Sequence, residues 1–240
     1  MFIHRQFAFC CALLLPISLP AAELTILVDT ATEMPMARFH NYQLVEGMHR
    51  EIGVALAGAL GREPHFLALP RKRIVGALGT GKADILCGYI PEWLDGTFPW
   101  SQPFLPLIEV VVTGRAFPRP RSLADLRGQP IGTVFGFSYP DLQRALGNDF
   151  VRADGPSTDL NLRKLAVGRL RHMVTSKVLI DYRLKLGNPV LKLHPPLVVK
   201  HLVTGCAVSP KGSVSPAQVE RAVTQLLRDG TVTAIMARYQ

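Results

Sequence analysis

Strand and helix patterns alternate along the first third of this 240-residue chain, and this alternation restricts the fold more than any other feature. Residues 24–29 form a β-rich segment. Over 44–60 the apolar residues recur in steps of three and four, which indicates an amphipathic helix that ends at Gly61. A strand over 65–69, a helix over 70–81 and a strand over 83–87 follow. This β-α-β-α-β order is typical of a parallel sheet with helices on both faces.

The same alternation begins again in the second half of the chain. Strands are expected over 131–134, 170–175, 190–193 and 202–208. Helices are expected after the cap residues Ser122 and Ser157, from Pro140, over 178–186 and, with a break at Gly230, over 215–239. Two α/β units of similar plan predict a protein with two lobes.

The first residues carry the pattern of an export signal. His4 and Arg5 precede an almost wholly apolar run over 7–19, and small residues follow it up to Ala22. The run is shorter than the ~20 apolar residues that a membrane span needs. We therefore expect a signal peptide over 1–22, cleavage near Ala22 and, in a Gram-negative-type cell, a periplasmic protein.

Removal of this segment leaves two of the four cysteines, Cys87 and Cys206. Two cysteines cannot form a disulfide framework for a chain of this size. Both lie in apolar, strand-like runs, so the favoured interpretation is two buried free thiols. A single disulfide stays open because the expected compartment is oxidising. No His lies at ligand spacing from either cysteine, so neither a metal site nor a cofactor is expected.

The formal net charge of +9 raises the question of nucleic-acid binding. The basic residues are scattered and do not form one stripe interleaved with aromatic side chains, so no nucleic-acid partner is expected. A solvated basic surface is the better interpretation, with an anionic ligand or partner as the alternative.

Five short motifs occur in a characteristic order. They are Gly-Met-His-Arg-Glu at 47–51, Ala-Leu-Gly-Thr-Gly-Lys-Ala-Asp at 77–84, Trp-Ser-Gln-Pro-Phe at 100–104, Leu-Ala-Asp-Leu-Arg-Gly-Gln-Pro-Ile-Gly at 123–132 and Leu-Leu-Arg-Asp-Gly-Thr at 226–231. In these motifs the chain resembles the family 3 extracellular solute-binding proteins, the periplasmic receptors of polar amino-acid ABC importers. The resemblance extends from residue 24 to residue 239.

The resemblance implies an α/β, two-lobed, type II periplasmic-binding-protein-like fold, in which each lobe is a mostly parallel sheet flanked by helices. Lobe 1 is then 23–112 plus 202–240, lobe 2 is 113–201, and the chain crosses between them near Thr113 and near 200–202. It also implies a monomer that closes around a small ligand and presents it to an ABC permease in the inner membrane.

In open α/β sheets, ligands bind beyond the carboxyl ends of the strands. This rule and the chemistry of the side chains predict ten ligand-binding residues: Thr30, Glu33, Arg71, Tyr89, Glu92, Trp93, Phe137, Ser138, Ser157 and Ser176. Phe137 and Ser138 lie at an expected helix N-terminus, which suits an anionic oxygen, although a plain helix cap explains Ser138 equally well. Tyr89 and Trp93 can stack on a flat ligand or simply pack at the cleft rim.

Two charged groups of the family are absent from their places. Its amino-acid-binding members have an Arg after a Thr-Pro-Glu run to clamp the α-carboxylate, and here Trp93 follows Ile-Pro-Glu. They also have an acidic residue for the ammonium group where this chain has Thr-Ser-Lys at 175–177. Arg71 is the best substitute cation, although a solvated charge is slightly favoured for it. Glu33 and Glu92 suit a ligand amine or a pair with Arg71.

The expected function is solute binding without catalysis, for a small polar solute that is an amino acid or an amino-acid-like or carboxylate compound. One alternative is a periplasmic dehydratase-type enzyme, an activity that this fold also hosts. Such an enzyme needs a general acid placed over its substrate, and the only candidate catalytic residues are Glu33, Glu92 and Arg71. Another alternative is a free-standing receptor that senses a ligand without transport. Among the histidines, only His172 lies mid-strand, and a satisfied structural role is expected for it.

Overall fold

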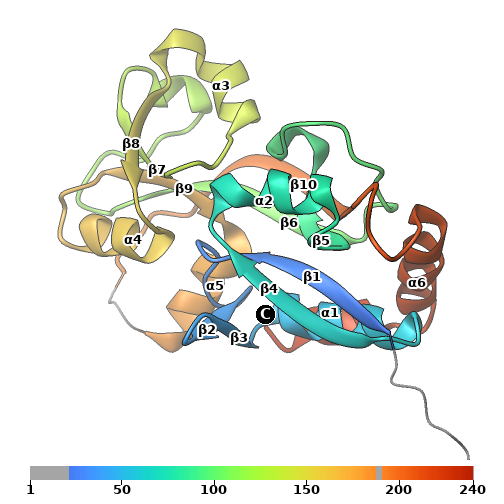
Figure 1. The fold of residues 1–240 in the computed structure, drawn as a ribbon. Coiled ribbons are helices and arrows are strands. Elements are labelled where there is room, and N and C mark those ends of the chain that lie inside the picture. Colours follow the sequence, from blue (N-terminus) through green and yellow to red (C-terminus); the bar gives the residue numbers. More distant parts are fainter. Residues whose placement is uncertain (1–21, 188–190, 240) are drawn as a thin grey trace, which may run out of the picture.

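The computed structural model describes residues 22–187 and 191–239, and it is an α/β protein built on one curled eight-stranded sheet (Figure 1). The strand order is β4-β1-β5-β10-β6-β9-β7-β8. The predicted signal peptide lies outside the described residues. Within them, no helix has both the length and the apolar character to span a bilayer.

The first half of the chain forms the expected parallel unit. Strand β1 (Glu23–Asp29) lies between β4 (Glu63–Leu69) and β5 (Ile85–Tyr89), and both pairs are parallel. Helices α1 (Met48–Ala59) and α2 (Arg71–Thr80) connect these strands. Gly81 ends α2 in the left-handed conformation, at a φ of 80°. The β-α-β-α-β prediction is confirmed here.

The start of the first helix differs from the prediction. Residues Gln43–Glu46 form strand β3, which pairs with β2 (Arg38–His40) in a small two-stranded sheet, and α1 begins only at Met48. Gly47 separates the two elements with a φ of 112°, and a Cβ there would lie 2.6 Å from the Met36 carbonyl oxygen. The regular spacing of apolar residues over 44–60 therefore runs across two elements. Strand β3 and helix α1 follow each other, and their apolar residues happen to keep the same spacing.

The second half repeats the plan. Strand β7 (Pro130–Val134) lies between β8 (Val151–Gly155) and β9 (His172–Ser176), and both pairs are parallel. The helices are α3 (Pro140–Leu146), α4 (Thr158–Ala166) and α5 (Lys177–Leu186). Ser122 and Asp125 form a capping box on the short 3-10 helix Leu123–Leu126. The expected strand at 190–193 is reduced, within the described residues, to a single bridge from Leu193 to Gly114.

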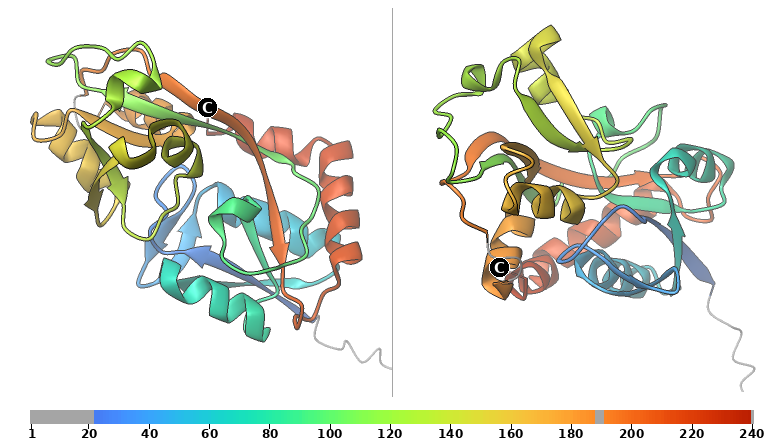
Figure 2. Two further views of the ribbon diagram at one scale, coloured as in Figure 1. Left: turned by 90° about the horizontal axis from the view of Figure 1, so that it is seen from above. Right: turned by 90° about the vertical axis from the view of Figure 1, so that its left-hand side faces the viewer.

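Two long antiparallel strands join the halves. Strand β10 (Leu197–Val208) pairs with β5 on one side and with β6 (Leu105–Thr113) on the other, and β6 pairs with β9 through its last five residues. Figure 2 shows β10 passing from one half of the molecule to the other. The structure is thus the two-lobed arrangement that was expected, and the exact lobe boundaries given above stay a prediction.

The C-terminal helices pack against α1 on the side of the first half of the sheet. Helix α6 (Pro216–Arg228) begins with a capping box between Ser215 and Gln218, and α7 (Thr231–Ala237) follows the predicted break at Gly230. Val219 and Leu226 of α6 and Leu56 of α1 belong to one buried apolar cluster. This packing fixes α1, whose N-terminus faces the site described below.

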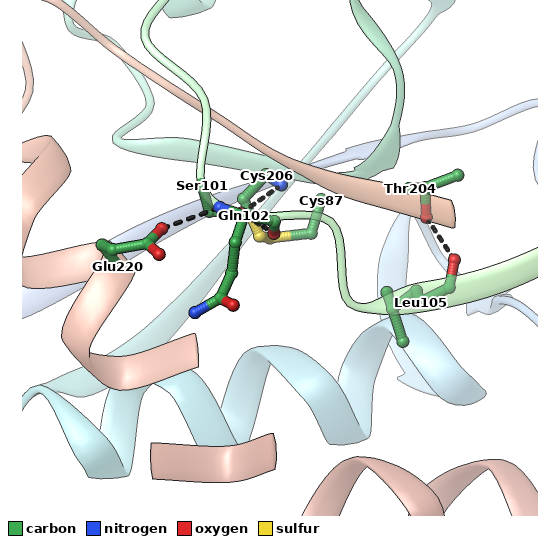
Figure 3. The surroundings of a disulfide bond; sticks show 7 residues. All are labelled: Cys87, Ser101, Gln102, Leu105, Thr204, Cys206 and Glu220. Carbon is green, nitrogen blue, oxygen red and sulfur yellow. Dashed lines mark hydrogen bonds between the residues drawn. A yellow bond between two sulfur atoms is a disulfide. The ribbon is translucent and has the colours of Figure 1, made fainter. Parts of the chain in front are cut away.

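Cys87 and Cys206 form a disulfide (Figure 3), so the favoured interpretation of two free thiols was wrong. The two residues are directly opposite each other in the antiparallel pair of β5 and β10, with their Cα atoms 3.9 Å apart. Next to the bond, the Cys206 amide donates to the Ser101 hydroxyl at 3.0 Å. The two cysteines are 119 residues apart in the sequence, and the register of β5 against β10 brings them together. No local sequence pattern predicts this pairing.

We expect removal of both cysteines as Cys87→Ala/Cys206→Ala to lower the free energy of unfolding by about 3–4 kcal/mol, because the bond closes a long loop in the unfolded chain. The measurement is thermal unfolding with and without a reductant. The reductant should lower the melting temperature of the parent and leave the double variant unchanged. An identical response of both proteins would contradict the bond.

Candidate ligand-binding cleft

A cavity with a volume of about 150 Å³ lies where the two halves of the sheet face each other. It is lined by residues at or after the carboxyl ends of β1, β5, β7 and β9, and by the first residues of α1, α2 and α4. The crossing strand β6 contributes Leu107 and Glu109. The cavity therefore lies at the strand ends to which the general rule for α/β sheets points.

Most of the predicted ligand-binding residues line this cavity: Glu33, Arg71, Tyr89, Trp93, Phe137, Ser138 and Ser176. Three do not line it. Thr30 donates its backbone N–H to the Leu69 carbonyl at 3.0 Å, Glu92 is exposed, and the Ser157 hydroxyl caps α4 by accepting the Leu160 N–H at 3.3 Å. A role in ligand binding stays a prediction for all ten.

Arg71 is a partly buried, paired cation and not the solvated charge that the sequence favoured. Its side chain is 13% exposed, and one guanidinium nitrogen lies 3.6 Å from the carboxylate of Asp29, which is 0% exposed. The guanidinium also donates to the Tyr89 hydroxyl and, at 2.8 Å, to the Trp93 carbonyl. Its central carbon lies 5.1 Å from the centre of the Phe137 ring, a cation–π contact across the cleft.

Asp29 ends β1 and anchors this arrangement. Its carboxylate accepts hydrogen bonds from the Ala31 amide at 2.9 Å and from the Tyr89 hydroxyl at 3.1 Å. Burial raises the pKa of Asp29, and the Ala31 amide and Arg71 act in the opposite direction. Because β1 pairs with β4 in parallel, the residues that follow these strands, including Arg71, lie beside Asp29.

Glu33 connects the two halves of the molecule. Its Oε1 atom accepts the Asp159 N–H in the first turn of α4 at 3.1 Å, and its Oε2 atom lies 3.7 Å from Arg183 of α5. Arg183 also lies 3.1 Å from the Asp159 carboxylate. Burial raises the pKa of Glu33, and the hydrogen bond from the Asp159 amide opposes that shift. Glu33 is thus a cross-cleft contact as well as part of the cavity wall.

The helix that follows β7 differs from the expectation. Its cap position is Tyr139, without a side-chain cap bond, so Ser138 is not the helix cap. Pro140 opens α3 and has no N–H to offer a ligand. The Tyr139 hydroxyl accepts the Val134 N–H at 3.0 Å, which holds the turn against the end of its own strand.

Sequence reasoning missed two ionisable residues of the cavity wall. Glu109 on β6 is 7% exposed, and burial, with Asp141 nearby, raises its pKa to about 7 although Lys200 opposes the shift. His49 lies in the first turn of α1, and burial lowers its pKa to about 4. Its buried Nε2 atom has no hydrogen-bond partner among the described residues. The signal that could have found Glu109 is a lone acid within the apolar run 105–113.

His172 has the structural role that was expected, but it is the first residue of β9, whereas His65 in β4 and His201 in β10 lie mid-strand. It is buried, and its two ring nitrogens lie 2.8 Å from the Thr113 hydroxyl and 3.0 Å from the Gln129 side-chain oxygen. Burial lowers its pKa. Across 22–187 and 191–239, no group of three or more His, Cys, Asp or Glu side chains is placed to hold a metal ion.

No protein-family model and no curated protein sequence matches the chain. Solved structures do. An ancestral arginine-binding protein bound to arginine is 20% identical, with a TM-score of 0.74 over 91% of this chain and 98% of that one. A histidine kinase sensor domain similar to periplasmic binding proteins is 20% identical, with a TM-score of 0.75 over 90% and 95%.

A third structure is an ancestral amino-acid-binding protein, a precursor of cyclohexadienyl dehydratase. It is 20% identical, with a TM-score of 0.72 over 91% of this chain and 95% of that one. The chain has the fold of these binding proteins. At this level of identity the likeness extends to the fold alone, so the solute must be argued from the cavity.

Chemically, the cavity combines an aromatic wall with the acidic and basic side chains of Glu33, His49, Arg71 and Glu109. Aromatic surface binds the apolar part of a small ligand, and a few placed polar groups orient it. Arg71 already has an anionic partner, whereas Glu109 accepts no hydrogen bond from any described residue. A cavity with this lining is chemically suited to a small polar molecule.

We expect Arg71→Met to lower the free energy of unfolding by about 3 kcal/mol, because it leaves Asp29 buried without a counter-charge. Adding Asp29→Asn should recover most of this loss. The control Lys72→Met changes an exposed neighbour and should stay within about 0.5 kcal/mol of the parent. Chemical unfolding measures all four proteins, and equal effects of Arg71→Met and Lys72→Met would show that Arg71 is solvated after all.

His49 should make stability depend on pH. Its pKa is lowered to about 4 in the folded chain, so the unfolded chain binds a proton first as the pH falls below about 6.5. The stability advantage of the parent over His49→Gln should therefore shrink by about 1–3 kcal/mol between about pH 6.5 and pH 4. Urea unfolding at several pH values measures this difference, and a constant difference would contradict the buried neutral imidazole.

Proposed function

We propose that this chain is an exported, periplasmic solute-binding receptor of an ABC importer. It captures a small polar solute, an amino-acid-like or related compound, by closure of its two lobes, and as a monomer delivers it to a permease. The observation that carries the proposal is the small, partly aromatic cavity between the halves of the sheet, with ionisable side chains from both of them.

Contacts across the cavity support closure as the capture step. Glu33, which follows β1, reaches the first turn of α4, and Arg71 on α2 stacks on Phe137 after β7. These contacts can form only when the two halves approach each other, so hinge motion about β6 and β10 would make and break them. The solved proteins of this fold that bind arginine or other amino acids agree with such a role.

Two alternatives have their own tests. The dehydratase alternative now depends on Glu109, because a carboxyl group with a pKa near 7 suits a general acid, whereas Glu92 lies outside the cavity wall. Turnover of prephenate would establish it. The sensing alternative has a structural counterpart in the histidine kinase sensor domain. Binding of solute without any effect of gene deletion on uptake would favour it.

We expect a thermal-shift screen of amino acids, opines, polyamines and small carboxylates to find a stabilising solute. At a concentration about 100 times the dissociation constant, a ligand adds about 2.7 kcal/mol to the stability. For a chain of this size that corresponds to a rise of roughly 5–10 °C in melting temperature.

The matched control is Ala31→Trp, which places a bulky side chain at the cavity wall while the Ala31 backbone bond to Asp29 is kept. This variant should lose the shift. If no solute in the screen raises the melting temperature of the parent, the receptor proposal fails. Strong stabilisation that Ala31→Trp retains would place the binding site elsewhere.

A further inference from the structure

The charges of the cavity wall are unevenly compensated. Arg71 is the one cation among the residues that line the cavity in the described chain, and its charge already faces the buried Asp29 at 3.6 Å. Its guanidinium also donates to Tyr89 and to the Trp93 carbonyl. A ligand carboxylate would therefore meet a cation whose charge and donors are largely occupied.

Glu109 is in the opposite situation. It is 7% exposed, lines the cavity, and accepts no hydrogen bond from any described residue. Lys200, its cross-strand partner on β10, is bonded at 3.1 Å to Asp141 instead. The Glu109 carboxylate is therefore free to accept hydrogen bonds from a molecule in the cavity that it lines.

Two further atoms point to the same conclusion. Glu33 Oε2 and His49 Nε2 are buried, have no hydrogen-bond partner among the described residues, and belong to side chains of the cavity wall. Glu33 Oε2 does have a counter-charge, because it lies 3.7 Å from Arg183. A carboxylate oxygen only accepts hydrogen bonds, and a neutral imidazole nitrogen can accept one. A ligand that donates hydrogen bonds could therefore satisfy these two atoms, although the whole chain carries a formal charge of +9.

We propose that the solute is an organic cation, an amine or a guanidine compound, and that Glu109 is its principal anionic partner, without a clamp for an α-carboxylate. This inference rests on the proposed receptor function and gives it a ligand class. The cavity volume of about 150 Å³ corresponds to roughly five water molecules at ~30 Å³ each, and a cavity of about this size holds a molecule such as benzene, so it suits a small ligand.

The ligand class has a consequence for pH. The charged and titratable groups around Glu109 are Lys200 on β10, Asp141 on α3 and, on the cavity wall, Glu33, Arg71, His49 and Tyr139. The pKa of Glu109 is raised to about 7 in the unliganded protein, and only its ionised form binds a cation well. Affinity should therefore fall roughly tenfold from about pH 8 to pH 6. His49, with a pKa of about 4, stays neutral over this range.

The experiment is isothermal titration calorimetry with three matched pairs of probes: agmatine and L-arginine, cadaverine and L-lysine, histamine and L-histidine. Within each pair the second compound adds an α-carboxylate and nothing else. We expect at least one amine to bind, and to bind no more weakly than its amino-acid counterpart. Glutarate, a carboxylate without a cation, should not bind.

Two variants assign the effect to Glu109. Glu109→Gln keeps the shape of the side chain and should weaken binding of the amine roughly 10- to 100-fold, with loss of the pH dependence. Glu63→Gln makes the same change at an exposed position of β4 and should bind like the parent. The pH profile of the parent needs no variant, so a folding defect in Glu109→Gln would not remove the test.

The outcomes separate this inference from the receptor proposal. A preference of tenfold or more for the amino acid in each pair that binds, or binding of glutarate alone, overturns the organic-cation assignment and leaves a receptor for another solute. Amine binding that Glu109→Gln leaves unchanged also overturns it. If neither these probes nor the wider screen give binding, the receptor function itself fails.

Discussion

The antiparallel pairing of β10 with both β5 and β6 is the interaction on which the rest of the structure depends. Strand β10 belongs to both halves of the sheet: it continues the parallel unit β4-β1-β5 on one side and, through β6, the unit β9-β7-β8 on the other. Its register with β5 places Cys206 opposite Cys87 and allows the disulfide. Its register with β6 places Lys200 opposite Glu109 at the cavity.

Much of this fold could be predicted from local patterns. Strands such as β1, β7 and β9 are short apolar runs bounded by turns or helix caps, and the ends of α2, α5 and α6 carry glycines or capping residues that define them. The sequence missed β6 because it carries a proline and a carboxylate within an apolar run, without alternation. It misassigned 43–46 because the apolar steps of β3 and α1 coincide across Gly47.

The site was predictable only where it follows the general rule for α/β sheets. Residues after β1, β5 and β7, such as Glu33, Trp93 and Phe137, could be placed at the cleft from the strand order alone. The burial of Arg71 could not, because it depends on Asp29, which is 42 positions away and is brought beside it by parallel pairing. Glu109 was outside the rule altogether, since it lies within a crossing strand.

This position gives Glu109 a property that the other polar residues of the cavity lack. Glu33 and Arg71 contact the opposite half of the molecule, so their surroundings must change when the halves separate. Glu109 lies in β6, whose ladders with β10 and β9 meet at this residue and run through the crossing region itself. A charge placed there keeps its strand partners whichever way the lobes turn. Recognition of the solute and closure of the cleft can therefore be carried by different side chains, with the anionic group already in place before the lobes close.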